Sequence, residues 1–131
     1  MSLFAILVPA AAVSLAAPQA DTQRQFDLIA DAVTSAQTCE QIGFSVDRQG
    51  IVDWSLEAKA DAMASGLSEP EAQTALEDAV REEYGRVLER FARAKIMDHA
   101  IDNVKRNNRN WHLRCEDLSK DPFTASYFSK A

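Results

Sequence analysis

Cysteine and histidine are scarce in this sequence, which contains two of each among 131 residues. A tetrahedral zinc site needs four ligands, so it would have to use every one of them. Their spacing matches no familiar zinc motif. We therefore predict no metal site and no cofactor, and note that such a site would need His99 and His112 together with both cysteines.

The short motifs that mark many small enzymes are missing as well. The chain has no Cys-x-x-Cys pair, no haem-attachment sequence, no Gly-x-Ser-x-Gly and no glycine-rich phosphate loop. A di-iron bundle requires Glu three positions before His, but Ile96 and Arg109 occupy those positions here. We predict that the protein is not an enzyme.

A calcium loop can be tested at the stretch SVDRQGIVDWSLE, where Gly50 would be the sixth loop position. The first and twelfth positions would then be Ser45 and Leu56, whereas an EF-hand requires Asp and Glu there. The stretch is instead predicted to be a turn that leads into a helix.

Charge is absent from the first twenty residues, MSLFAILVPAAAVSLAAPQA. The apolar run from Leu3 to Leu15 has the length of a signal-peptide core, and small residues follow it, although no base precedes it. We predict a signal peptide over residues 1–16, with cleavage between positions 16 and 20, and a periplasmic or secreted protein. The membrane would be contacted only through this segment, if it stays uncleaved.

Glycine and proline are few, and β-branched residues never alternate in strand-like runs. We therefore predict an all-α fold for residues 17–131: a single domain, a small bundle of about four helices stapled by one disulfide, with a short aromatic C-terminal tail. Gly43 and Gly66 should end the first two helices, and Ser68 with Glu71 forms a capping box for the third. The predicted helices are Asp21 or Thr22 to Ile42, Ile51 to Ser65, Ser68 or Glu69 to about Lys105, and Trp111 to Leu118.

The third helix is predicted from apolar residues at helical spacing over about nine turns, and it either runs unbroken or breaks near Gly85 or around Asp98. The asparagine-rich stretch KRNNRN, residues 105–110, is predicted to end it. Trp54 is expected to be a core anchor. The expected core faces are Phe26, Ile29, Ala30 and Val33 in the first helix, Ile51, Val52, Leu56, Ala58, Ala62 and Met63 in the second, and Leu76, Ala79, Val80, Tyr84, Val87, Leu88, Phe91, Met97, Ile101 and Val104 in the third.

Cys115 allows three interpretations: a nucleophile activated by His112, a metal ligand, or one half of a disulfide. In an exported chain with two cysteines, a bridge from Cys39 to Cys115 is the favoured one. It would close a loop across 76 positions and stabilise the fold by about 4 to 5 kcal/mol in the chain-entropy model.

Acidic residues outnumber basic ones by 20 to 14, but unevenly. Residues 21–66 hold eight acids and three bases, and residues 67–104 hold nine acids and five bases. Residues 105–131 reverse the balance, with three acids and six bases. Nucleic-acid binding depends on neutralising phosphates, so this acidic balance argues against a nucleic-acid partner.

The chain runs from Thr38-Cys39, through a tryptophan-bearing helix, to ASGLSEPEAQTALEDAV and a late cysteine. This layout resembles a family of short exported two-cysteine helical proteins of unknown function. Thr38-Cys39-Glu40 is also similar to the first cysteine region of small periplasmic acid-stress chaperones. The resemblance implies no activity. We expect a non-enzymatic binding or interaction module of the cell envelope or periplasm, with an unknown protein or envelope partner. The alternatives are an acid-stress chaperone, or a thiol- or metal-dependent enzyme centred on Cys115.

Overall fold

A computed structural model describes residues 18–96 and 100–131. Its helices are α2 (Ala20–Gln41), α3 (Arg48–Ala64), α4 (Glu69–Ile96) and α5 (Ala100–Lys120). Two short strands, β1 (Phe44–Val46) and β2 (Phe128–Lys130), form a small antiparallel sheet. The prediction of a small all-α bundle is confirmed, whereas the sheet was not predicted.

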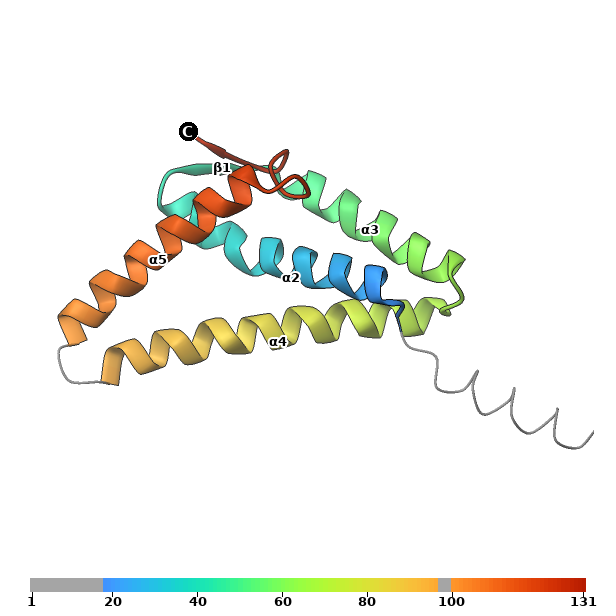
Figure 1. The fold of residues 1–131 in the computed structure, drawn as a ribbon, viewed down its shortest axis with the longest axis horizontal. Coiled ribbons are helices and arrows are strands. Elements are labelled where there is room, and N and C mark those ends of the chain that lie inside the picture. Colours follow the sequence, from blue (N-terminus) through green and yellow to red (C-terminus); the bar gives the residue numbers. More distant parts are fainter. Residues whose placement is uncertain (1–17, 97–99) are drawn as a thin grey trace, which may run out of the picture.

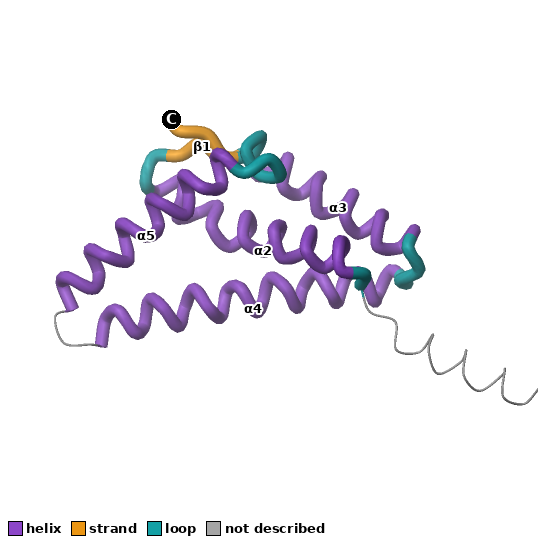
Figure 2. The backbone as a smooth tube through the Cα atoms, viewed as in Figure 1, coloured by secondary structure: helices purple, strands orange, loops and turns teal. Residues whose placement is uncertain are grey.

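The helices form a flat frame in which α2 lies between α3 and α4 (Figure 1). α2 and α4 are close at one end and diverge toward the other, where α5 crosses from α4 back to α2 (Figure 1). The sheet and the C-terminal tail cover the junction of α2, α3 and α5 (Figure 2).

Local sequence signals set the helix ends. Gly43 and Gly66 have φ values of 101° and 121°, a left-handed conformation that favours glycine after a helix. Asp47 caps α3, because its carboxylate accepts a hydrogen bond of 2.9 Å from the Gly50 N–H. The helix predicted in place of a calcium loop is confirmed, but Ser45 and Val46 before it lie in strand β1 rather than in a turn.

The capping box at the start of α4 is also confirmed. The Ser68 N–H donates to Glu71 Oε1 at 2.8 Å, and the Glu71 N–H donates to Ser68 Oγ at 3.2 Å. These hydrogen bonds from Ser68 lower the pKa of Glu71. Leu67 and Ala72 are both buried beside the cap, as expected of a hydrophobic staple.

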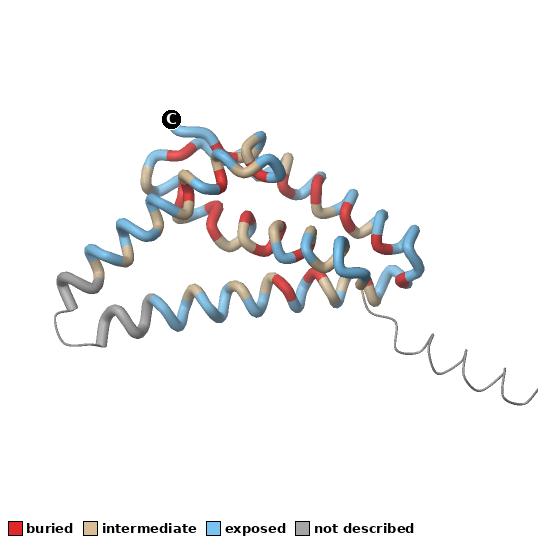
Figure 3. The backbone as a smooth tube through the Cα atoms, in the orientation of Figure 1, coloured by how far each residue is buried: buried red, intermediate tan, exposed pale blue. Residues whose placement is uncertain are grey.

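The core lies among α2, α3, the first half of α4 and the C-terminal half of α5, and the two strands also contribute to it (Figure 3). Phe26 and Ile29 of α2 are fully buried. The Trp54 ring is buried, stacks on Tyr127 with 5.4 Å between ring centroids, and donates its indole N–H to Gln25 Oε1 at 2.9 Å. Trp54 is therefore the core anchor that was predicted.

Several residues that were expected in the core are exposed instead. On α3 the buried positions are Ile51, Trp54, Ala58 and Ala62. The small alanines allow close helix packing, and this rotates the larger side chains out of the core. The residues wrongly assigned to the core, each roughly 40 to 56% exposed, are Val33, Val52, Leu56, Met63, Tyr84 and Leu88.

The prediction that residues 105–110 end a helix is wrong, because they lie inside α5. Asparagine costs only a few tenths of a kcal/mol in a helix interior, and tertiary contacts outweigh such a penalty. α4 passes through Gly85 and ends at Ile96, and a new helix begins at Ala100, so a continuous helix to Lys105 is also wrong. The alternative break at Asp98 lies outside the described residues. Phe91, Met97 and Ile101 have side chains that the structure does not describe.

The aromatic tail packs against its own chain. Phe128 is buried and pairs with Val46 in the sheet, and the buried Thr124 hydroxyl donates to the Leu118 carbonyl at 2.6 Å. A Cβ at Gly50 would lie 2.5 Å from Asp47 Oδ2 and 2.8 Å from Tyr127 Cδ1, so a glycine there leaves room for both the cap of α3 and the tail.

Candidate functional site

The two cysteines form a disulfide that joins the last turn of α2 to α5. Both Cys39 and Cys115 have no exposed surface, and their Cα atoms are 5.7 Å apart. The predicted bridge is confirmed. It leaves no thiol on Cys115 for His112 to activate and no thiolate pair to bind zinc.

The structure describes one of the two histidines that a zinc site would need. His112 is exposed, and His99 lies outside the described residues. Within residues 18–96 and 100–131, no group of three or more histidine, cysteine, aspartate or glutamate residues is placed to hold a metal ion.

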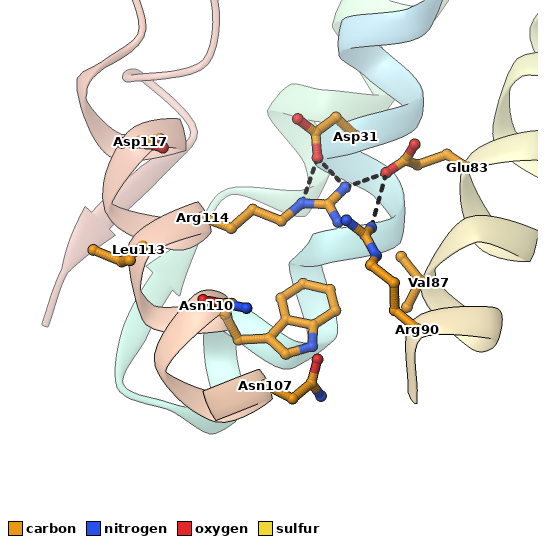
Figure 4. Close-up of a pocket in the computed structure, with 10 residues that line it drawn as sticks. Asp31, Glu83, Val87, Arg90, Asn107, Asn110, Leu113, Arg114 and Asp117 are labelled. Atoms are coloured by element: carbon orange, nitrogen blue, oxygen red, sulfur yellow. Dashed lines mark hydrogen bonds and ion pairs between the residues drawn. The ribbon is translucent and has the colours of Figure 1, made fainter. Parts of the chain in front are cut away.

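A cavity of about 430 Å³ lies where α2, α4 and α5 diverge (Figure 4). Ligand pockets commonly have volumes of roughly 300 to 1,000 Å³. Its walls combine charged and amide side chains with a few apolar ones. The lining residues are Asp31, Glu83, Val87, Arg90, Asn107, Asn110, Trp111, Leu113, Arg114 and Asp117.

Arg114 connects the three helices across this cavity. Its Nε donates to Asp31 Oδ1 of α2 at 2.7 Å, and its Nη2 lies 2.5 Å from Glu83 Oε1 of α4 (Figure 4). The Arg114 and Glu83 side chains are only 18% and 13% exposed. Because water screens such contacts poorly, the pair is a substantial link between α5 and the rest of the fold.

Glu83 is held by a cluster of arginines. Arg86 Nη2 lies 2.7 Å from Glu83 Oε2, and Arg90 Nη2 lies 3.8 Å from Oε1. Burial raises the pKa of Glu83, but hydrogen bonds from Arg86 and Arg114 outweigh it, so the pKa lies below the ordinary value. The carboxylate is therefore ionised at neutral pH, and its low basicity makes it a poor general base.

The remaining polar groups of the cavity are available for other contacts. Arg90 forms an ion pair with Glu83, and among the described residues no hydrogen bond involves the side chains of Asn107 and Asn110. The Arg114 guanidinium lies 5.1 Å from the centre of the Trp111 ring, which it holds in the cavity wall. The cavity thus offers donors and acceptors beside the apolar side chains of Val87 and Leu113.

Sequence analysis did not identify this cavity. Asp31, Glu83 and Arg114 come from three helices and carry no local motif. The predicted disulfide could have indicated part of this cavity. Arg114 directly precedes Cys115, and Asp31 lies about two turns before Cys39 on α2. Pairing the cysteines brings that arginine and that aspartate to neighbouring helix segments.

Comparison with known proteins finds no matching family, no similar curated protein and no similar solved structure. The resemblance to exported two-cysteine helical proteins therefore stays a prediction. No helix in the described part of the chain is both long and apolar enough to cross a membrane. The predicted signal peptide falls almost wholly on residues 1–17, outside the described residues.

Proposed function

We propose that the protein is an exported, non-enzymatic binding module of the cell envelope or periplasm, which holds a partner in the cavity between α2, α4 and α5. The observation that carries the proposal is that this cavity is fixed on two sides. The buried disulfide ties α5 to α2, and Arg114 ties α5 to both α2 and α4. A preformed site binds with a smaller loss of conformational entropy than a flexible one.

The disulfide also supports export. Disulfides form and persist mainly in oxidising compartments, and this one is fully buried. The uncharged N-terminal segment is consistent with the same route.

The charge state of the cavity supports binding over catalysis. Asp31 and Glu83 both face Arg114, and Glu83 also faces Arg86. General acid–base catalysis at neutral pH works best with a group whose pKa lies near 7, whereas the pKa of Glu83 is shifted away from that range. Both cysteine sulfurs are already bonded to each other.

Photocrosslinking in the native cells tests the proposal. A photoreactive residue would replace Asn110 in the cavity wall, and a matched variant would carry it at Glu57, an exposed position of α3 outside the cavity. We expect a discrete adduct whose protein component, once identified and purified, binds the wild-type chain. Thiol-dependent or metal-dependent turnover by the purified protein would contradict the proposal.

An acid-stress chaperone is the second candidate, and the contacts around Arg114 favour it specifically. Glu83 has a lowered pKa, so it contributes stability above about pH 4.5 that is lost as pH falls through its folded pKa. Protonation of Glu83 would remove one of the two counter-ions of Arg114, with Asp31 remaining, and would weaken the attachment of α5 to α4. Suppression of client aggregation that fails to increase between pH 7 and pH 3 would exclude this candidate.

A further inference from the structure

The sequence between α4 and α5 lacks the residues that end the other helices of this protein. Gly43 follows α2 and Gly66 follows α3, both with left-handed φ values. Only residues 97–99 separate α4 from α5, and the chain has no glycine, asparagine or proline from position 86 to position 102. The sequence therefore contains no signal that stops a helix between α4 and α5.

The spacing of apolar residues also runs from α4 into α5 without a change of phase. Alternating steps of three and four residues lead through eight positions from Val87 to Trp111, and only Arg90 and Asn108 are polar. One helix through residues 97–99 would place all eight positions on one face, as in a coiled coil, whereas two separate helices need not share a phase. The apolar positions are Val87, Ala94, Met97, Ile101, Val104 and Trp111.

The packing that holds α5 in place lies far from its junction with α4. Among the described residues, none from 80 to 90 in α4 or from 104 to 113 in α5 is buried. We define the C-terminal unit as residues 114–131. It packs on α2, β1 and α3 through the disulfide, the pairing of the two strands and the stacking of Tyr127 on Trp54. A second copy of the chain offers this unit an identical surface.

We propose that two copies of this chain exchange α5 and the C-terminal unit. In the exchanged dimer, α4 and α5 join through residues 97–99 into one helix of about 78 Å, and each C-terminal unit packs on the other copy. Each copy then supplies Cys115 to the bridge with Cys39 of the other, and Arg114 to its cavity. The proposal goes beyond the binding function and does not depend on what the cavity holds.

The closed chain already has the register that this exchange requires. A twofold axis at position 99 places Val87 of one copy beside Trp111 of the other, and these two residues line the same cavity from α4 and α5. Glu83 and Arg114, which pair where the two helices enter the packed body, lie about 46 Å apart along one continuous helix. This distance leaves room for two bodies side by side.

The energy balance favours the exchange as concentration rises. The contacts of the C-terminal unit are the same in both forms. The dimer gains helical hydrogen bonds across residues 97–99 and an apolar seam where the two long helices cross. It loses the translational freedom of one chain, so its population depends on protein concentration.

Complementary cysteine variants of the mature chain test the exchange. Cys39→Ala and Cys115→Ala chains with different tags are refolded together in a glutathione buffer. In an exchanged dimer, Cys115 of the first variant meets Cys39 of the second. We expect a heterodimer on a non-reducing gel that separates on reduction. Each variant refolded alone is the matched control and should give no covalent dimer, because alanine then occupies one side of every bridge.

The wild-type chain provides a test that does not depend on these variants. Both of its bridges join different chains in the exchanged form, although each still links Cys39 to Cys115. We therefore expect wild-type dimer to persist on a denaturing, non-reducing gel and to separate into single chains after reduction.

Substitutions at Asp98 test the sequence between the helices. Alanine favours a helix more than glycine does, and the difference counts twice in a dimer, so the dimerisation constants of Asp98→Ala and Asp98→Gly should differ by about twentyfold. Light scattering after size-exclusion chromatography over a range of concentrations measures both constants. Glu57→Ala and Glu57→Gly are the matched control pair, because Glu57 is exposed on α3, which is helical in both forms. Their dimerisation constants should be equal.

Each of the following results would overturn the inference. They are wild-type protein that stays monomeric at every concentration, a wild-type dimer that separates on the non-reducing gel, and complementary variants that form no heterodimer. Covalent dimers of either variant alone, in the amount seen for the mixture, would indicate random oxidation and would also overturn it. Equal dimerisation constants for Asp98→Ala and Asp98→Gly would show that the two copies associate through another surface.

Discussion

Replacing Arg114 by leucine tests the contact that joins the three helices. The substitution removes charge-assisted hydrogen bonds to Asp31 and Glu83, each worth about 1.5 to 3 kcal/mol. Asp31 keeps contact with water because its side chain is 35% exposed, and Glu83 keeps Arg86 as a counter-ion. We therefore expect the free energy of unfolding to fall by about 2 to 4 kcal/mol at pH 7, less than for a completely buried pair.

Urea denaturation followed by far-ultraviolet circular dichroism measures this change, with the disulfide intact in every sample. Arg81→Leu is the matched control, because the Arg81 side chain is 73% exposed and pairs with Asp78 on the same helix. Exposed pairs contribute about 0 to 1 kcal/mol, so this variant should remain within that range of wild type. A loss in Arg114→Leu no larger than that in Arg81→Leu would refute the structural role of Arg114.

The same variants give a prediction about pH. The folded-state pKa of Glu83 lies below its ordinary value of 4.5, so its stabilising contribution is complete above that pH and is lost as pH falls through the folded pKa. The difference between wild type and Arg114→Leu should therefore shrink between pH 5 and pH 3. A difference that stays constant over this interval would show that the loss comes from packing rather than charge.

Three further changes test the fold. The double variant Cys39→Ala with Cys115→Ala should lose about 2 to 5 kcal/mol of unfolding free energy in urea denaturation, and an unchanged midpoint would contradict the stabilising role of the bridge. Ser68→Ala should lose about 1 kcal/mol of unfolding free energy in the same assay, because it removes one hydrogen bond of the capping box. A loss below a few tenths of a kcal/mol would argue against that cap. Gly50→Ala should lose about 1 to 3 kcal/mol of unfolding free energy, since its Cβ would lie 2.5 Å from Asp47 Oδ2 and 2.8 Å from Tyr127 Cδ1. Wild-type stability would show that the Asp47 cap and the tail both adjust freely.

The features that could be predicted from sequence are those set by local chemistry. Gly43 and Gly66 end helices because their φ values favour glycine, and Ser68 with Glu71 caps α4 through backbone hydrogen bonds within four residues. The pairing of Cys39 with Cys115 followed from having two cysteines in a chain predicted to be exported. None of these predictions required knowledge of distant contacts.

The features that were missed depend on contacts between distant segments. Strand β1 exists because β2, more than eighty positions later, pairs with it, and neither strand has an alternating pattern of its own. α5 continues through its asparagine-rich stretch, where Asn107, Asn110, Trp111 and Arg114 all line the cavity. Helical periodicity located α3, but Ala58 and Ala62 face the core beside Ile51 and Trp54, whereas Val52, Leu56 and Met63 are exposed. The ion pairs of the cavity likewise join positions 31, 83 and 114.

The most direct test of the whole account is the intact mass of the protein recovered from its native compartment and alkylated under denaturing conditions, with and without prior reduction. The account predicts a chain that lacks about its first 16 residues, the length expected of a signal peptide, and that gains two alkyl groups only after reduction. Two alkylated cysteines without reduction would contradict both export and the bridge between Cys39 and Cys115, on which the fixed shape of the cavity depends.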